Sequence, residues 1–314
     1  LNFEMIKLLE PQLRAWQDDD AIAMVLLKGA GDKAFCAGGD VVSLHHAMAQ
    51  GKPTSLVEDF FTLEYKLDYL IHTFDKPILV WGNGIVMGGG LGLMAGASHR
   101  VVTETSRIAM PEQTIGLYPD VGGSYFLHKM PQNVGLFLGL TSASINCDDA
   151  HFVSLADHFI DSNKYDAMLA QILTAKWGKT VSLNHERLTD LLTDLDNQSA
   201  RMPKGNIKAN LKTIQKLGEF KTLQEQVNYI LGLTTNDKWL QRAQKSLKHG
   251  CPLSCALVSE QLKTSKGKSL LACFKMELGM SVRAGEVGEF QEGVRALLID
   301  KDGAPNWQYK TLSD

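Results

Sequence analysis

The chain has 314 residues, of which 44% are hydrophobic and 21% charged, and its net charge is −3 at pH 7. This composition is typical of a folded globular protein and excludes a largely disordered chain or a fibrous repeat. Since no basic excess attracts phosphate groups or anionic lipids, we expect neither nucleic acid nor a membrane surface as a partner. Five irregularly spaced cysteines predict reduced thiols in an intracellular protein, with no disulfide framework and no metal site.

The N-terminal quarter of the chain predicts helices separated by a buried strand. An amphipathic helix is expected over residues 3–17, followed by an apolar strand at 22–27. A second helix begins near Asp40, because aspartate is a favoured N-cap residue. A third helix covers about 56–72 and carries its apolar residues on one face.

The next segment predicts a parallel crossover. We expect a buried strand at 77–81, a loop at 82–88, a helix of small residues at 89–97 and a strand at 100–103. A helix that connects two buried strands indicates a parallel sheet and therefore an α/β fold. The uncharged run within this segment is long enough to cross a bilayer, but its central glycines would weaken a membrane helix.

The remainder of the chain is predicted to be mainly helical from about residue 163 onward. The apolar run at 294–299 fits either a strand or a helix. Pro203 and Gly205 indicate a boundary near 200–206. We therefore divide the chain into a core over 1–205 and a mainly helical region over 206–314.

Two glycine-containing segments carry groups that suit a ligand. In 35–40, two glycines precede a helix start and can turn backbone N–H groups toward a ligand oxygen, although a plain loop is favoured for this segment alone. In 82–90, residues without side chains would let a carbonyl group approach a helix N-terminus closely. Close packing of a helix on a sheet explains that segment equally well, and its G-x-G-x-x-x-G spacing imitates a dinucleotide-binding motif only weakly.

The segment 110–123 presents two carboxylates, Glu112 and Asp120, each directly after a proline. Proline fixes the local backbone, and rigidly presented carboxylates in an apolar segment suit acid–base or nucleophilic chemistry. An equally supported interpretation is that Asp120 caps a helix starting near Val121 and that Glu112 is a solvated turn residue.

The three segments in this order resemble the crotonase (enoyl-CoA hydratase/isomerase) superfamily over about residues 1–160, and the resemblance returns at 289–296. Within the superfamily, residues 34–40, 87–90 and 111–123 look most like the 3-hydroxyisobutyryl-CoA hydrolase branch. The resemblance implies a spiral of β-β-α units with a helical C-terminal region. It also implies a small-molecule acyl-CoA substrate, with coenzyme A as part of the substrate and no separate cofactor or metal.

The resemblance also implies a backbone site for the thioester. Its carbonyl oxygen would lie between the N–H groups of Gly39 and Gly89, with Gly38 and Gly88 beside the substrate. Ala37 would line the adenine pocket.

Three acidic residues match the family pattern. Glu112 matches the reactive glutamate, Asp120 the second carboxylate of the hydrolase branch, and Glu64 a substrate-contacting glutamate of that branch. Hydratases of the superfamily carry a further catalytic glutamate where this chain has Gly92, which argues against hydratase chemistry.

The expected function is hydrolysis of a short hydroxyacyl-CoA thioester, 3-hydroxyisobutyryl-CoA in valine catabolism. The alternatives are an enoyl-CoA hydratase or isomerase of the same fold and a non-catalytic nucleotide-binding or scaffold protein. Trimers are common in the superfamily, so the resemblance allows a homo-oligomer. Bacterial cytoplasm and mitochondrial matrix both fit reduced cysteines, and we expect a truncated N-terminus because family members have strand residues ahead of Leu1.

Overall fold

The computed structural model describes residues 1–49 and 55–313. These residues group into two compact units, each assembled from three segments that are separated in the sequence. The first unit comprises Leu1–Gly38, Lys66–Ile108 and Ile145–Lys208, and the second comprises Gly39–Tyr65, Ala109–Ser144 and Ala209–Asp314. The units interleave along the chain, and the predicted division into 1–205 and 206–314 stays a prediction.

The first unit contains nearly all of the strand residues, which form two sheets. The pairs β1–β3, β3–β5, β5–β7 and β2–β4 are parallel. The larger sheet has the order β1-β3-β5-β7, from strands β1 (Val25–Lys28), β3 (Ile78–Gly82), β5 (His99–Val102) and β7 (His158–Phe159). The smaller sheet has the order β2-β4-β6, from β2 (Ala34–Cys36), β4 (Ile85–Met87) and β6 (Arg107–Ala109). Consecutive strands alternate between the sheets, so that each turn of the chain adds one strand to both. This alternation is the predicted spiral of β-β-α units.

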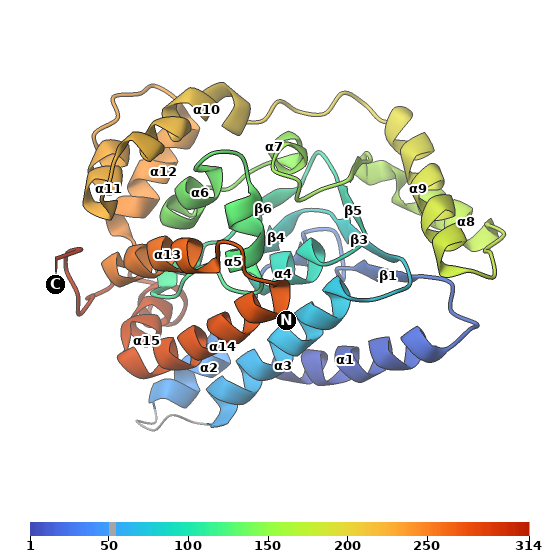
Figure 1. The fold of residues 1–314 in the computed structure, drawn as a ribbon, viewed down its shortest axis with the longest axis horizontal. Helices are drawn as coiled ribbons and strands as arrows, with labels where there is room; N and C mark the ends of the chain where they lie inside the picture. Colours follow the sequence, from blue (N-terminus) through green and yellow to red (C-terminus); the bar gives the residue numbers. More distant parts are fainter. Residues whose placement is uncertain (50–54, 314) are drawn as a thin grey trace. The chain divides into compact units, whose positions relative to one another are not determined.

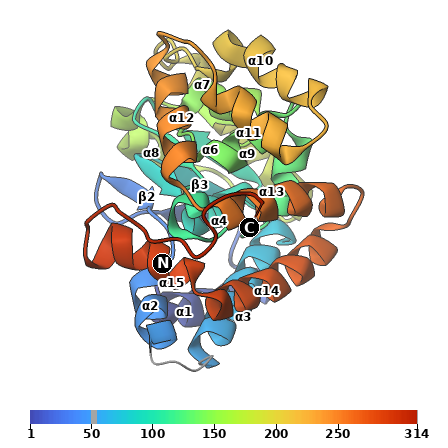
Figure 2. The same cartoon turned by 90° about the vertical axis from the view of Figure 1, so that its left-hand side faces the viewer.

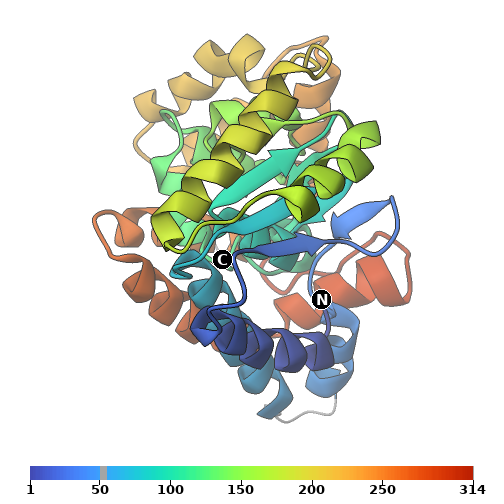
Figure 3. The ribbon, with the colours of Figure 1, turned by 90° about the vertical axis from the view of Figure 1, so that its right-hand side faces the viewer.

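Helices of the first unit cover the larger sheet. Figure 3 shows α8 (Tyr165–Thr174) and α9 (Val181–Asn197) across one face of its strands, where Leu188 and Leu192 join Leu79 and Val101 in a buried apolar core. The unit also contains α1 (Phe3–Asp18), α4 (Gly89–Ala95), α7 (Cys147–Phe152), the short 3₁₀ helix η3 (Ser162–Lys164) and the second part of α3 (Ser55–His72).

The second unit is mainly helical in its described residues. Figure 1 labels its helices, and Figure 2 shows α11 and α12 side by side. Its α-helices are α2 (Val41–Ala49), the first part of α3, α5 (Gly123–Phe126), α6 (Val134–Thr141), most of α10 (Ile207–Gln215), α11 (Leu223–Leu231), α12 (Lys238–His249), α13 (Pro252–Ser265), α14 (Leu270–Val287) and α15 (Glu289–Val294). Shorter turns are the 3₁₀ helices η1 (Glu112–Ile115), η2 (Leu127–Lys129) and η4 (Lys216–Glu219), and the π-helix η5 (Arg295–Ile299).

The predicted elements are confirmed with local corrections. Asp40 caps α2 as expected, because its carboxylate accepts hydrogen bonds from the Ser43 backbone N–H (3.1 Å) and hydroxyl (2.7 Å). The loop predicted at 82–88 is wrong in part, since β4 lies within it, paired with β2. The strand predicted at 22–27 begins only at Val25, and 294–299 is helical.

Candidate active site

Asp120 lies in a tight turn between Pro119 and α5. The Asp120 carbonyl accepts a hydrogen bond from the Gly123 N–H (2.7 Å), and Val121 and Gly122 both have left-handed backbones, with φ of 49° and 89°. A β-branched residue is strained in that region, which is a recurrent feature of functional sites. The cap interpretation of Asp120 is wrong, because Gly122 is the N-cap of α5 and the Asp120 carboxylate instead accepts from the Tyr65 hydroxyl (2.6 Å).

Glu112 opens η1 and points into the protein. Its side chain is buried, and its Oε2 atom has no hydrogen-bond partner among the described residues. The interpretation of Glu112 as a solvated turn residue is therefore wrong. The short helix ends at Gly116, whose φ is 74° and where a Cβ atom would lie 2.2 Å from the Glu289 carbonyl oxygen. Glycine is needed at this position to bring the Glu112 helix against α15.

Glu64 projects from α3 toward the backbone of Gly39. A Cβ atom on Gly39 would lie 3.6 Å from Glu64 Oε1 and 3.2 Å from the Phe60 ring. Glu64 is buried, and its Oε1 has no hydrogen-bond partner within the described chain. The structure thus brings the backbone at position 39 beside a buried carboxyl group.

The three carboxyl groups influence one another strongly. Burial, followed by the charge of Asp120, raises the pKa of Glu64 to about 8. Burial and then Asp120 raise the pKa of Glu112 well above its usual range. Burial raises the pKa of Asp120 to about 6, against the hydrogen bond from Tyr65. Because burial and like charges disfavour ionisation, the site favours protonated carboxyl groups, a property that suits acid–base chemistry.

The Asp120 turn is held by polar residues that the sequence analysis missed. Glu277 on α14 is fully buried, and its two carboxylate oxygens accept the backbone N–H groups of Gly122 and Ser124, each at 2.8 Å. Gln261 donates to the Pro119 carbonyl at 2.7 Å. The acid at position 277 interrupts an otherwise apolar run at 276–280 of α14, and this is the one signal that could have marked Glu277 as a buried, partnered group.

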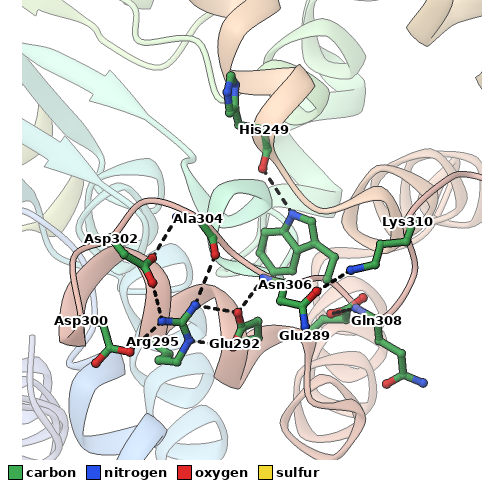
Figure 4. A network of polar contacts seen from close by, with 11 residues as sticks. His249, Glu289, Glu292, Arg295, Asp300, Asp302, Ala304, Asn306, Gln308 and Lys310 are labelled. Carbon is green, nitrogen blue, oxygen red and sulfur yellow. Dashed lines mark hydrogen bonds and ion pairs between the residues drawn. The ribbon is translucent and has the colours of Figure 1, made fainter.

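The C-terminal tail is tied to the segment at Glu289–Arg295 by polar contacts (Figure 4). Helix α15 in this segment packs against η1. The Glu289 carboxylate accepts the backbone N–H groups of Gln308 (3.0 Å) and Tyr309 (2.9 Å). Arg295 pairs with Glu292 and also with two aspartates of the tail, Asp300 and Asp302. These contacts fix the helix on which the Glu112 turn rests.

The remaining predicted residues lie in the first unit. Gly88 is the N-cap of α4, with φ of 52°, and Gly89 is the first residue of that helix. Gly38 has φ of 122°, and Ala37 lines an apolar cavity of about 360 Å³ whose other walls include Phe35, Leu67 and Leu93. A Cβ atom on Gly90 would lie 2.3 Å from the Cys36 carbonyl oxygen, so close packing of α4 on β2 is confirmed.

The predicted residues therefore fall into two sets. Gly39, Glu64, Glu112 and Asp120 belong to the second unit, and Ala37, Gly38, Gly88 and Gly89 belong to the first. The convergence of the Gly39 and Gly89 amides on one oxygen stays a prediction.

The described residues contain neither a metal-binding cluster nor a helix suited to span a membrane. Over residues 1–49 and 55–313, no group of three or more His, Cys, Asp or Glu side chains is arranged to hold a metal ion. In the same residues, no helix has both the length and the apolar character to cross a membrane.

Comparison with known proteins identifies the family. The model of the enoyl-CoA hydratase/isomerase family matches residues 1–314. The chain belongs to this family. The predicted resemblance and the α/β spiral fold are thereby confirmed.

Individual relatives resemble the chain over its whole length. It is 36% identical over 313 residues to mitochondrial 3-hydroxyisobutyryl-CoA hydrolase of Danio rerio, covering 100% of this chain and 80% of that protein. It is 33% identical to the small ribosomal subunit protein mS47 of Neurospora crassa, covering 100% of this chain and 64% of that protein. The crystal structure of an enoyl-CoA hydratase from Rhodobacter sphaeroides matches with a TM-score of 0.86 and 32% identity, over 100% of this chain and 87% of that one.

Proposed function

We propose that this protein is an acyl-CoA thioester hydrolase that acts on 3-hydroxyisobutyryl-CoA, in valine catabolism. The observation that supports it best is the buried cluster of Glu64, Glu112 and Asp120, in a chain related over its whole length to a 3-hydroxyisobutyryl-CoA hydrolase. A short hydroxyacyl chain suits this cluster because a carboxylate can accept a hydrogen bond from the substrate hydroxyl.

Hydrolysis of a thioester needs a nucleophile and donors for the developing oxyanion. Glu112 either attacks the carbonyl carbon, releasing the CoA thiolate and leaving an acyl–enzyme anhydride that water then splits, or it activates a water molecule directly. A thiolate is a good leaving group, since the pKa of a free thiol is about 8.5. Asp120 and Glu64 bind the substrate hydroxyl or position the water.

The backbone amides of Gly39 and Gly89 are the proposed donors to the carbonyl oxygen. Each such donor is typically worth about 10²–10³ in rate. Gly38 and Gly88 flank these amides, and the apolar cavity at Ala37 is the proposed pocket for the adenine of CoA.

The test measures free-thiol release from a panel of short acyl-CoA esters, read beside the absorbance of the enoyl group. We expect CoA release with 3-hydroxyisobutyryl-CoA and a loss of at least about 100-fold in Glu112→Gln. Glu260→Gln is the matched control, because Glu260 is an exposed glutamate paired with Lys263. Undiminished hydrolysis by Glu112→Gln would overturn both proposed routes. A single turnover in H₂¹⁸O separates them, since only the anhydride route places label in Glu112.

Two alternative functions have distinct outcomes in the same assay. A hydratase or isomerase would change the enoyl absorbance without releasing CoA. The likeness to a protein named as a ribosomal subunit favours a scaffold as the second candidate. A scaffold would produce neither signal.

The location and assembly of the protein are also proposals. The mitochondrial name of the Danio rerio relative supports the mitochondrial matrix, with bacterial cytoplasm as the other proposed compartment. Light scattering of the purified protein, with and without CoA, would test the proposed homo-oligomer.

A further inference from the structure

A continuous chain of hydroxyl groups connects Asp120 to the backbone of α14. Tyr65 OH lies 2.6 Å from Asp120 Oδ2 and 2.6 Å from Ser281 Oγ. Ser281 Oγ lies 2.8 Å from Tyr118 OH, which donates to the Glu277 carbonyl oxygen at 2.7 Å. Tyr65, Tyr118 and Ser281 are all buried, so each contact depends on protons from the chain itself.

Counting protons distinguishes the two states of Asp120. The chain has four oxygen–oxygen contacts and three hydroxyl protons, and its last acceptor is a carbonyl that donates nothing. When Asp120 is ionised, Tyr65 donates to it and Tyr118 donates to the carbonyl. Ser281 can then donate its one hydroxyl proton either to Tyr65 or to Tyr118. Its contact with the other tyrosine places two oxygen atoms side by side with no proton between them.

Protonation of Asp120 supplies the fourth proton. Asp120 then donates to Tyr65, Tyr65 to Ser281, Ser281 to Tyr118, and Tyr118 to the carbonyl. Each of the four contacts becomes a hydrogen bond by rotation of the Tyr65 and Ser281 hydroxyl groups alone, because Tyr118 donates to the carbonyl in both states. Two buried oxygen atoms in contact without a proton between them cost free energy. The chain of hydroxyl groups therefore favours the protonated form of Asp120.

We propose that Ser281 is a positioning residue that, through Tyr65, stabilises the protonated form of Asp120 and so makes Asp120 a proton acceptor. Its use in catalysis rests on the proposed hydrolysis. A water that attacks a carbonyl carbon must release a proton as its oxygen–carbon bond forms. The CoA sulfur must take one up when the carbon–sulfur bond breaks. In the route in which Glu112 activates a water that attacks the thioester directly, Asp120 can take that proton from Glu112, hold it until the carbon–sulfur bond breaks and pass it to the sulfur, which restores Asp120 as a carboxylate.

Other ionisable groups face Asp120 from each element packed around it. Glu64 lies on α3, Glu112 on η1 and Glu277 on α14, and burial, with the charge of Asp120 as a further cause, raises the pKa of each. Glu64 and Glu277, with pKa values of about 8, are therefore largely protonated where Asp120, with a pKa of about 6, titrates. The effect of the hydroxyl chain is therefore tested by replacing its hydroxyl-bearing residues while these three carboxyl groups are retained.

The experiment titrates the ¹³C-labelled Asp120 carboxyl group of the full chain by NMR, with its signal assigned by Asp120→Asn. Ser281→Ala is expected to lower the pKa of Asp120 by about one unit, since the ionised form then keeps every remaining contact filled. Tyr65→Phe is expected to raise it, because the carboxylate loses its donor. Ser265→Ala removes another buried serine hydroxyl, which bonds a carbonyl of its own helix, and should leave the pKa of Asp120 unchanged.

Opposite shifts of the Asp120 pKa in Ser281→Ala and Tyr65→Phe would show that the hydroxyl chain controls this pKa. A general loosening of the fold would move the Asp120 pKa in the same direction in both variants. An unchanged or raised pKa in Ser281→Ala would overturn the proposal. The acidic limb of the kcat/KM profile for CoA release should move by the same amount as the NMR titration. If no acyl-CoA is hydrolysed, the proposed function fails while the NMR titration still decides the proposal on Ser281.

Discussion

Replacing Glu64 by glutamine should make the protein more stable at alkaline pH. Burial and the charge of Asp120 raise the pKa of Glu64 from 4.5 to about 8, so the folded protein binds this proton more tightly than the unfolded chain does. The free energy of unfolding therefore falls as pH rises from about 4.5 through 8. With about 1.4 kcal/mol per pKa unit, Glu64 should remove about 3 kcal/mol of stability between pH 5 and pH 8.

Urea unfolding of the wild type and Glu64→Gln at several pH values checks this magnitude. At pH 5 Glu64 is protonated in the folded protein but already ionised in much of the unfolded chain, so the variant should be more stable there by less than about 1 kcal/mol, and its advantage should grow by about 3 kcal/mol by pH 8. The difference between the proteins reports the Glu64 carboxyl group together with its effect on the pKa of Glu112, which burial, the charge of Asp120 and then that of Glu64 raise. Glu260→Gln is the control, since its carboxylate is exposed. Parallel curves for the wild type and Glu64→Gln would refute the reasoning.

Three further substitutions test the support of the site. Glu277→Gln places an amide N–H group against a buried main-chain N–H, and should lower the free energy of unfolding by about 2–4 kcal/mol in urea titrations. Gly90→Ala sets a methyl group 2.3 Å from the Cys36 carbonyl oxygen, and should cost about 1–3 kcal/mol in thermal unfolding. Gly116→Ala combines a φ of 74° with a clash 2.2 Å from the Glu289 carbonyl, and should lower kcat for CoA release more than it changes KM, because it displaces the helix that begins with Glu112.

The sequence predicted the elements whose local signals are strong. The apolar run before Gly82 became β3, and the small-residue segment after it became α4, because both are buried on all sides. The strands β2, β4 and β6 escaped prediction, since each has only three residues and stands beside glycines or turns. Such short strands are fixed by pairing with distant partners, which a window of neighbouring residues does not reveal.

The residues of the site that the sequence predicted also carry local signals, whereas the residues that it missed depend on distant partners. Glu112 and Asp120 stood out through the prolines before them and through the family resemblance. Glu277 and Ser281 did not, because their partners lie 155 residues away at Gly122 and 216 residues away at Tyr65. Polar support from a distant helix has no local pattern, so only the folded chain shows it.

A cluster of buried acids lowers the stability of the folded protein. One face of α14 supplies polar groups that hold Asp120, one of these acids, in place. Glu277 and Ser281 are four residues apart on α14 and therefore point the same way. The first anchors the strained Asp120 turn through two main-chain hydrogen bonds, and the second completes the hydroxyl chain to Asp120. A shift of α14 would disturb the geometry and the protonation of Asp120 together. Substitutions that loosen α14 should therefore change the rate and the pH profile in parallel, whereas those in the α9 core of the first unit should change stability alone.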